Sequence, residues 1–217
     1  MSQFYTSSPM DCLRLGDVVS GFPIATPKSD RLVEGEGMPR NLIISVDQPK
    51  YLVVMTPCCS IEKGAVVLAP LGRLHHGFFK NPHFTEDFTR LNRKVAPENS
   101  LPPFAWEQLS SEEKAAKLNE GAGYAFRDYF VYEPHDFLPP YRVKKEKAEW
   151  ETRYYIVDFK TMYRFECNMI RRENQNTPVP EGCNKLLQLT VVARNELRDK
   201  FTDLFSRIPE EDRGELL

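Results

Sequence analysis

Four short apolar stretches in the first third of the chain have the pattern of β-strands. They are residues 13–22 (LRLGDVVSGF), 41–47 (NLIISVD), 51–56 (YLVVMT) and 65–71 (AVVLAPL). The last two are almost continuously apolar, which is typical of strands that are covered on both faces or closed into a small barrel. Residues 23–40 contain many Pro, Gly and charged residues and are predicted to form an exposed loop.

The rest of the chain mixes strand and helix patterns. Alternating apolar residues predict strands at 127–133, 153–170 and 185–193, with Lys160–Thr161 as a break in the second. Between the two groups of strands, residues 84–120 are expected to form a helical insertion. It contains a helix start at Ser110 with Glu113 three residues later as a capping box, and a stop at Gly121.

A C-terminal helix is predicted at residues 194–208. Its apolar side chains recur with helical spacing and form one stripe: Leu197, Phe201, Leu204, Phe205 and Ile208. The pattern as a whole predicts one α+β domain over residues 1–217. Its centre is a small curled antiparallel β-barrel of the SH3-like kind, built from residues 13–72 and the strands within 127–193, with the helices inserted or packed beside it.

Composition narrows the environment of the protein. The chain has 217 residues, of which 41% are hydrophobic, and a net charge of −2, so a uniformly basic nucleic-acid-binding surface is not expected. The first residues lack the pattern of a secretory signal, and no apolar run approaches the length of a membrane span. Five scattered cysteines are expected to be reduced thiols, which indicates a cytoplasmic protein.

Residues 13–72 resemble the barrel of MazF/PemK-type toxins, which are endoribonucleases. The resemblance lies in Gly16-Asp17-Val18-Val19, in the strand that ends at Thr56-Pro57, and in Val66–Leu71. In that family an arginine before the second of these strands acts together with the Ser or Thr on the scissile phosphate. Here that place is occupied by Gln48-Pro49-Lys50-Tyr51, and Arg31 and Arg40 lie in the preceding loop.

A second resemblance covers more of the chain. The segment Thr56-Pro57-Cys58-Cys59-Ser60-Ile61 and the C-terminal helix are similar to an uncharacterised bacterial family. In that family a strand ends in Ser/Thr-x-x-Cys-Asp-Ile, and the C-terminus is an Arg/Leu/Phe helix. This resemblance implies no particular activity.

The adjacent thiols of Cys58 and Cys59 have three interpretations. They pack as small apolar side chains at a strand end, act as a nucleophile or redox pair, or bind a metal together with His75, His76 and His83. No CxxC or HxxxH spacing is present, and packing is the preferred interpretation. We therefore expect reduced thiols, no bound metal and no cofactor.

Basic and aromatic residues are interleaved after the fourth strand, as on surfaces that bind single-stranded RNA. The basic candidates are Arg73, His75, Lys80, Arg90, Arg93 and Lys94, and the aromatic ones are Phe78, Phe79 and Phe84. Residues 142–147 form a second basic segment. If the protein cleaves RNA, Thr56, Arg73 and His76 are the candidate catalytic residues.

Two classes of function remain. The first is a non-enzymatic interaction module of a bacterial stress, toxin-like or phage-defence system. It would bind a protein partner encoded in the same operon or a second copy of itself, with Phe201 and Phe205 of the C-terminal helix as candidate docking residues. The alternative is a metal-independent endoribonuclease or single-stranded RNA-binding protein of the MazF/PemK type. The two are distinguished by an Arg or His within reach of Thr56, or by an exposed apolar patch.

Overall fold

The computed structural model of the protein describes most of the chain. The described residues are 3–29, 42–57, 60–61, 64–80, 82–92, 100–101, 103–119, 123–124, 126, 128–170 and 177–205. The chain divides into two compact units. Unit 1 comprises residues 3–71 and 161–190, and unit 2 comprises residues 72–160 and 191–217.

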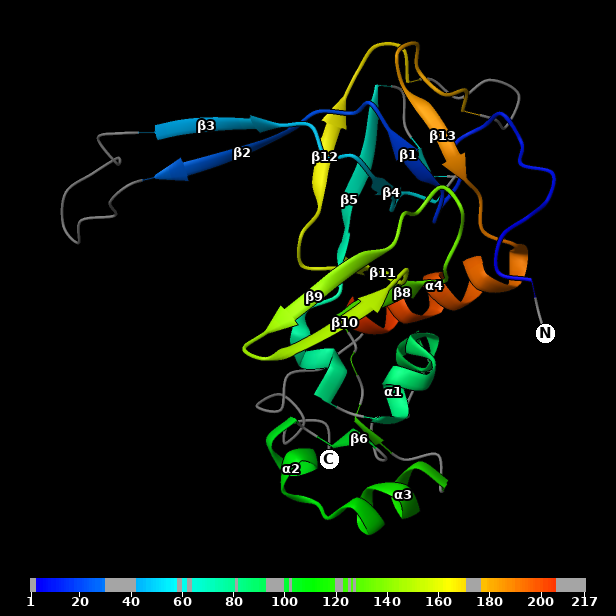
Figure 1. Cartoon of the computed structure of the whole chain (residues 1–217). Coiled ribbons are helices and arrows are strands. Elements are labelled where there is room, and N and C mark those ends of the chain that lie inside the picture. The colour runs from blue at the N-terminus through cyan, green and yellow to red at the C-terminus, as the bar shows by residue number, and fades with distance from the viewer. Residues whose placement is uncertain are drawn as a thin grey trace, which may run out of the picture. The chain divides into compact units, whose positions relative to one another are not determined.

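Unit 1 contains a strongly curled antiparallel sheet that forms half a barrel (Figure 1). Its strands are β1 (Val18–Ser20), β4 (Leu52–Val54), β5 (Ala65–Arg73), β12 (Tyr163–Glu166) and β13 (Asn184–Leu187). They pair in the order β13-β1-β4-β5-β12. The predicted antiparallel pairing of the strands on either side of the cysteine turn is confirmed, because Leu52 pairs with Pro70 and Val54 with Leu68.

The inner face of this sheet encloses an apolar core. Val19, Leu52, Val54 and Leu68 are each fully buried, as is Phe22 after β1. The side chains of Tyr163, Phe165 and Cys167 close the core from β12 and the turn that follows it. The near-continuous apolar character of the β4 and β5 sequences is therefore explained by burial on both faces.

A two-stranded hairpin also belongs to unit 1. It consists of β2 (Ile24–Ser29) and β3 (Leu42–Asp47), and among the described residues no other strand pairs with either of them. Figure 1 shows the hairpin extending away from the curled sheet. Two expectations are wrong here: the predicted loop begins with a strand, and the predicted strand at 41–47 lies outside the sheet. The charged, Pro-containing sequence IATPKS hid the strand character of β2.

Unit 2 combines short helices with paired strands. Its first helical elements are η2 (His76–Lys80), α1 (Pro82–Glu86), η3 (Phe88–Asn92), α2 (Pro103–Gln108) and α3 (Ser111–Asn119). The short strands β6 (Ser100–Leu101) and β7 (Gly123–Tyr124) pair in parallel. The remaining elements are β8 (Tyr129–Tyr132), β9 (Tyr141–Lys145), β10 (Ala148–Thr152), β11 (Tyr155–Asp158) and the helix α4 (Val191–Phe205).

The capping box of α3 forms as predicted. The amide of Glu113 donates to Ser110 Oγ at 3.2 Å, and the amide of Ser110 donates to Glu113 Oε2 at 2.8 Å. The second bond stabilises the charged carboxylate and holds the pKa of Glu113 below its ordinary value. The predicted stop at Gly121 lies outside the described residues.

The core of unit 2 is aromatic. Phe78, Phe79, Phe84 and Phe88 are buried with Leu74, and Val131 and Ile156 contribute from β8 and β11. The hairpin β9–β10, which the sequence pattern did not predict, covers this core with Val143 and Trp150. Its other face carries Arg142, Lys144, Glu149 and Glu151, and this charge hid the strand pattern.

The mixed α+β class is confirmed, and so is the curled antiparallel sheet. The helix α4 starts at Val191, three residues before the predicted start, and residues 206–208 of the predicted helix lie outside the described part of the chain. The chain divides into two compact units, and the prediction of a single domain over residues 1–217 is not tested by this division. None of the helices that the structure describes has the length and apolar character that a bilayer crossing requires.

Candidate interaction sites

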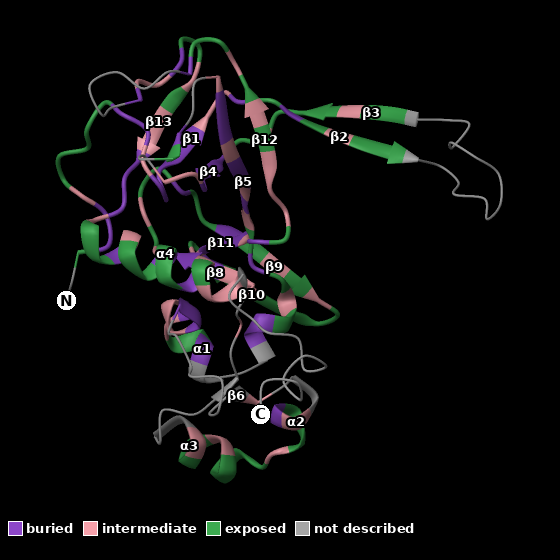
Figure 2. Cartoon of the chain, turned by 180° about the vertical axis from the view of Figure 1, so that it is seen from behind, coloured by how far each residue is buried: buried purple, intermediate pink, exposed green. Residues whose placement is uncertain are grey.

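The register of the β2–β3 hairpin separates its side chains into two faces. On one face Ala25 lies opposite Val46 and Pro27 opposite Ile44. All four are exposed, with Ile44 at 63% and Val46 at 68% (Figure 2). Paired residues of an antiparallel ladder share a face, so this side of the hairpin presents an apolar surface to solvent.

The opposite face of the hairpin is mostly polar. Thr26 lies opposite Ser45, Lys28 opposite Ile43, and the buried Ile24 opposite Asp47 at the base. The hairpin therefore has the pattern of a half-buried sheet, in which one face is apolar and the other is solvated. Its apolar face is the one for which the described residues provide no cover.

The backbone edges of the hairpin also differ. Pro27 has no N–H, so its pair with Ile44 is a non-hydrogen-bonded one, and the N–H and C=O groups of Ile44 point away from β2. Because the two kinds of pair alternate, Val46 is oriented in the same way. The outer edge of β3 consequently has a regular set of donors and acceptors, whereas Pro27 interrupts the outer edge of β2.

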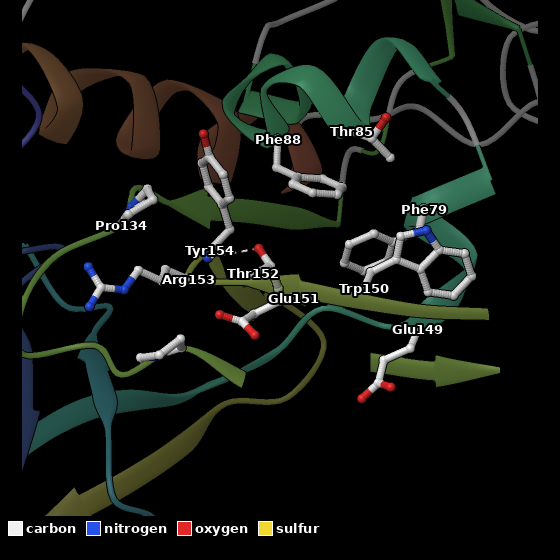
Figure 3. Close-up of a pocket in the computed structure, with 11 residues that line it drawn as sticks. Phe79, Thr85, Phe88, Pro134, Glu149, Trp150, Glu151, Thr152, Arg153 and Tyr154 are labelled. Atoms are coloured by element: carbon white, nitrogen blue, oxygen red, sulfur yellow. Dashed lines mark hydrogen bonds between the residues drawn. The ribbon is translucent and has the colours of Figure 1, made fainter. Parts of the chain in front are cut away.

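Unit 2 contains a cleft of about 800 Å³. Four aromatic rings follow one another along it: Trp150 stacks on Phe79 with centroids 5.2 Å apart, Phe79 contacts Phe88 at 4.9 Å, and Phe88 contacts Tyr154 at 5.4 Å. Phe79 and Phe88 are buried, while Trp150 and Tyr154 are half-buried. Figure 3 shows Glu149 and Glu151 pointing away from the rings of Phe88 and Tyr154.

Polar groups surround the hydroxyl of Tyr154, and Asp87, Thr89 and Glu133 are not among the residues that line the cleft. The Tyr154 hydroxyl donates to Asp87 Oδ1 at 3.4 Å, and Asp87 also accepts hydrogen bonds from the amide and the hydroxyl of Thr89. Burial, followed by the charges of Asp87 and Glu196, raises the pKa of Glu133. Burial, followed by the charges of Asp87 and Glu133, raises the pKa of Tyr154.

The three predicted catalytic residues fall in different units. Thr56 belongs to unit 1. Its Oγ1 accepts a hydrogen bond from the amide of Val67 at 2.8 Å, which links the residues after β4 to β5. Arg73 and His76 belong to unit 2. The guanidinium of Arg73 lies over the ring of Tyr141, 5.2 Å from its centroid, and the imidazole of His76 lies 3.9 Å from that of His75.

Half of the six predicted nucleic-acid-binding residues have described surroundings, Arg73 among them. Arg90 forms an ion pair of 2.6 Å with Glu86, and His75 Nδ1 accepts a hydrogen bond from the amide of Gly77 at 3.2 Å. The side chain of Lys80 lies outside the described part, as do Arg93 and Lys94. The three aromatic side chains that were to stack with bases, Phe78, Phe79 and Phe84, are buried in the core of unit 2.

Only some of the residues in the thiol and docking predictions belong to the described part of the chain. Cys58 and Cys59 lie outside the described residues, and within those residues no three His, Cys, Asp or Glu side chains are grouped to hold a metal ion. Phe201 of α4 contacts the buried Phe159 edge-on at 5.2 Å, which is an internal contact of unit 2. The side chain of Phe205 is not among those described.

Sequence reasoning missed the residues that define both surfaces. The apolar face of the hairpin needed the pairing of β2 with β3, which Pro27 and Lys28 obscured. Trp150 and Tyr154 stand at alternating positions of a charged segment. That alternation is the pattern that could have predicted a strand there.

The fold and these two surfaces define a mixed α+β protein with a half-barrel sheet and two candidate surfaces for binding other molecules. No family model, no curated protein and no solved structure matches the chain.

Proposed function

We propose that this protein is a non-enzymatic interaction module of a bacterial stress, toxin-like or phage-defence system. In this proposal it docks onto another protein through the apolar face of the β2–β3 hairpin. The observation that carries the proposal is the exposure of Ile44 and Val46, 63% and 68%, on a face whose cross-strand residues, Ala25 and Pro27, are also exposed and apolar.

The stability of a hairpin supports the proposal. A two-stranded hairpin is marginally stable in water and becomes stable when its apolar face is covered. Complete burial of an Ile or Val side chain contributes about 1.5–3 kcal/mol. Covering Ile44 and Val46 by a partner would therefore stabilise both the hairpin and the complex.

The edge of β3 specifies the chemistry of the partner. The outward N–H and C=O groups of Ile44 and Val46 can pair with one further strand, whereas Pro27 interrupts the other edge. We therefore propose a partner protein that offers an unpaired strand beside an apolar surface, and that is encoded in the same operon. We further propose that the half-barrel closes in the SH3-like manner and that the protein acts in the cytoplasm.

The proposal is tested by co-expressing the tagged chain with each product of its neighbouring genes. The mass of the complex is measured by light scattering after size exclusion, and its affinity by calorimetry. We expect one neighbour to form a complex of defined stoichiometry with the natural chain. The double substitution Ile44→Asp and Val46→Asp should weaken this complex at least about tenfold, because it places charge in a buried apolar contact.

Ser45→Asp is the matched control, because it introduces the same side chain on the opposite face of the same strand. It should leave the affinity within about twofold. A complex that survives the double substitution on the apolar face would overturn the proposed docking surface. A dimer of the chain that dissociates with the same double substitution would identify a second copy as the occupant and contradict the operon partner.

A further inference from the structure

Two cysteines of unit 1 stand at the two edges of its curled sheet. In the described part of this unit β12 and β13 each pair with one strand, so they form the ends of the sheet (Figure 1). Cys167 directly follows β12, and Cys183 directly precedes β13. The two thiols therefore mark the beginning and the end of the connection between the two edges.

Contacts within the core bring these two positions to the same side of the sheet. The rings of Phe22 and Phe165 meet edge-on, with centroids 5.2 Å apart. Phe165 precedes Cys167 by two residues, and both pack against the core of the half barrel. Gly21, next to Phe22, lies against Cys183, because a Cβ added to Gly21 would be 3.0 Å from Cys183 Cα. The contact between the two rings thus joins the surroundings of the two cysteines.

Both thiols pack against one apolar core and remain partly exposed. Cys167 and Cys183 are among the half-buried side chains that cover the cluster around Phe22 and Leu52. Both are free thiols. Burial, followed by the charge of Cys167, raises the pKa of the Cys183 thiol, so the two sulfur atoms are close enough for one charge to act on the other. Their partial exposure leaves them accessible to a small oxidant.

We propose that Cys167 and Cys183 form a reversible disulfide when the protein meets hydrogen peroxide. The sulfur of Cys167 attacks one peroxide oxygen, so that an S–O bond forms, the O–O bond breaks and one water leaves. The sulfur of Cys183 then attacks the sulfur of Cys167, an S–S bond forms, and the S–O bond breaks with release of a second water. The thiols lose two electrons and two protons in total, and the peroxide accepts them. Cys183 reacts second because its raised pKa disfavours the thiolate.

The disulfide would join the two edges of the half barrel covalently. It closes the connection of residues 168–182 into a loop, and such a bond stabilises a protein mainly by restricting the unfolded chain. Oxidation should therefore move the midpoint of urea unfolding to a higher concentration. Amides of β12 and β13 that exchange only through global unfolding should exchange at least about tenfold more slowly in the oxidised protein.

Peptide mapping of the full chain tests the proposal. The reduced protein is treated with hydrogen peroxide in molar excess, its remaining thiols are alkylated, and it is digested with trypsin without a reductant. Cleavage after Arg171 and Arg172 places the two cysteines on different peptides. Mass spectrometry should identify a main cross-linked species that joins the peptide of Cys167 to that of Cys183. Dithiothreitol should release the two peptides and restore the original urea midpoint.

Substitutions of single cysteines assign the bond. Cys167→Ser and Cys183→Ser should each abolish the cross-linked species and the shift in urea midpoint. Cys12→Ser is the matched control and should keep both, because Cys12 is buried and takes no part in the bond. Circular dichroism of the reduced form verifies that each variant is folded, and the mapping of the natural chain does not depend on any variant. A main disulfide to Cys58 or Cys59, no cross-link at all, or an unchanged urea midpoint after cross-linking would each overturn the proposal.

Discussion

The side chain of Asp17 has a structural role in the fold. Asp17 is fully buried, and its Oδ2 accepts from the amide of Arg14 at 2.8 Å and lies 2.7 Å from Lys185 Nζ. Lys185 also donates to the carbonyl groups of Met10 and Cys12 and to Gln188 Oε1, each at 2.8 Å. Asp17 and Lys185 thus connect the N-terminal segment to β13.

Removal of one member of this buried ion pair should strongly destabilise the protein. Lys185→Met removes the ammonium group that lies 2.7 Å from the buried carboxylate of Asp17, and we expect a loss of about 3–5 kcal/mol in the free energy of unfolding. Urea unfolding followed by circular dichroism measures the change. Arg164→Met is the control, because the Arg164–Glu166 pair is exposed at 63% and 70%, and its loss should cost at most about 1 kcal/mol. Equal effects of the two substitutions would contradict this view.

Lys200 is expected to make stability depend on pH. Burial lowers the pKa of its ammonium group to about 7, although the charges of Asp128 and Asp203 oppose the shift, and its Nζ donates to the carbonyl of Leu91. Below pH 7 both the folded and the unfolded chain hold this proton. Between pH 7 and the ordinary lysine range only the unfolded chain does, so Lys200 makes stability rise with pH there.

The comparison with Lys200→Met isolates this effect. The free energy of unfolding of the natural chain minus that of the variant should rise by about 1.4 kcal/mol per pH unit between pH 7.5 and 9. Urea denaturation at three pH values in this range provides the slope. A difference that stays constant with pH would show that Lys200 keeps its proton in the folded protein.

At the scale of elements, local signals in the sequence were predictive. The strands on either side of the cysteine turn pair as expected, and the Ser110–Glu113 box begins α3. The break at Lys160–Thr161 separates β11 from β12. Each signal depends on residues that are close in the sequence.

The elements that were missed depend on distant contacts or on mixed patterns. β2 contains Pro27 and Lys28 and becomes a strand only by pairing with β3, across the 30–41 segment. β9 and β10 alternate apolar and charged residues, and their turn places Glu146 at a φ of 54°, which the sequence does not signal by a glycine. Tertiary pairing determines strand formation at such sites more than intrinsic propensity does.

The cap of α3 gives a prediction at this scale. Ser110→Ala removes the hydroxyl that accepts from the Glu113 amide, and we expect a loss of about 1 kcal/mol with faster amide exchange in the first turn of α3. Ser111→Ala, one residue later and exposed, should change stability by less than about 0.5 kcal/mol. Hydrogen exchange measured by mass spectrometry distinguishes the two variants. Unchanged exchange in Ser110→Ala would show that the cap does not hold the helix.

At the scale of the whole molecule, the chain passes between the two units after Leu71, after Lys160 and after Thr190. One of these points coincides with the break predicted from the sequence at Lys160–Thr161. The candidate catalytic set was harder to predict, because sequence order alone does not assign Thr56 to one unit and Arg73 and His76 to the other. The hydroxyl of Thr56 also has a structural hydrogen bond with Val67.

An interaction module should not cleave RNA. We expect a fluorescent single-stranded RNA to remain intact with the purified chain, both with and without a chelator. RNA cleavage at a 2′-hydroxyl needs a base for the proton and a cation for the phosphate charge. Metal-independent cleavage that is lost in folded Arg73→Ala or His76→Ala would instead establish the endoribonuclease alternative.

Amide exchange in the β2–β3 hairpin tests the docking claim most directly. In the free protein the amides of Ile44 and Val46 point away from β2 and should exchange rapidly, while those of Ile43 and Ser45 are paired with β2 and should exchange more slowly. In the complex with the operon partner, residue-resolved exchange by nuclear magnetic resonance should show Ile44 and Val46 becoming protected at least about tenfold. Unchanged exchange at these two amides, with protection appearing elsewhere, would contradict the account.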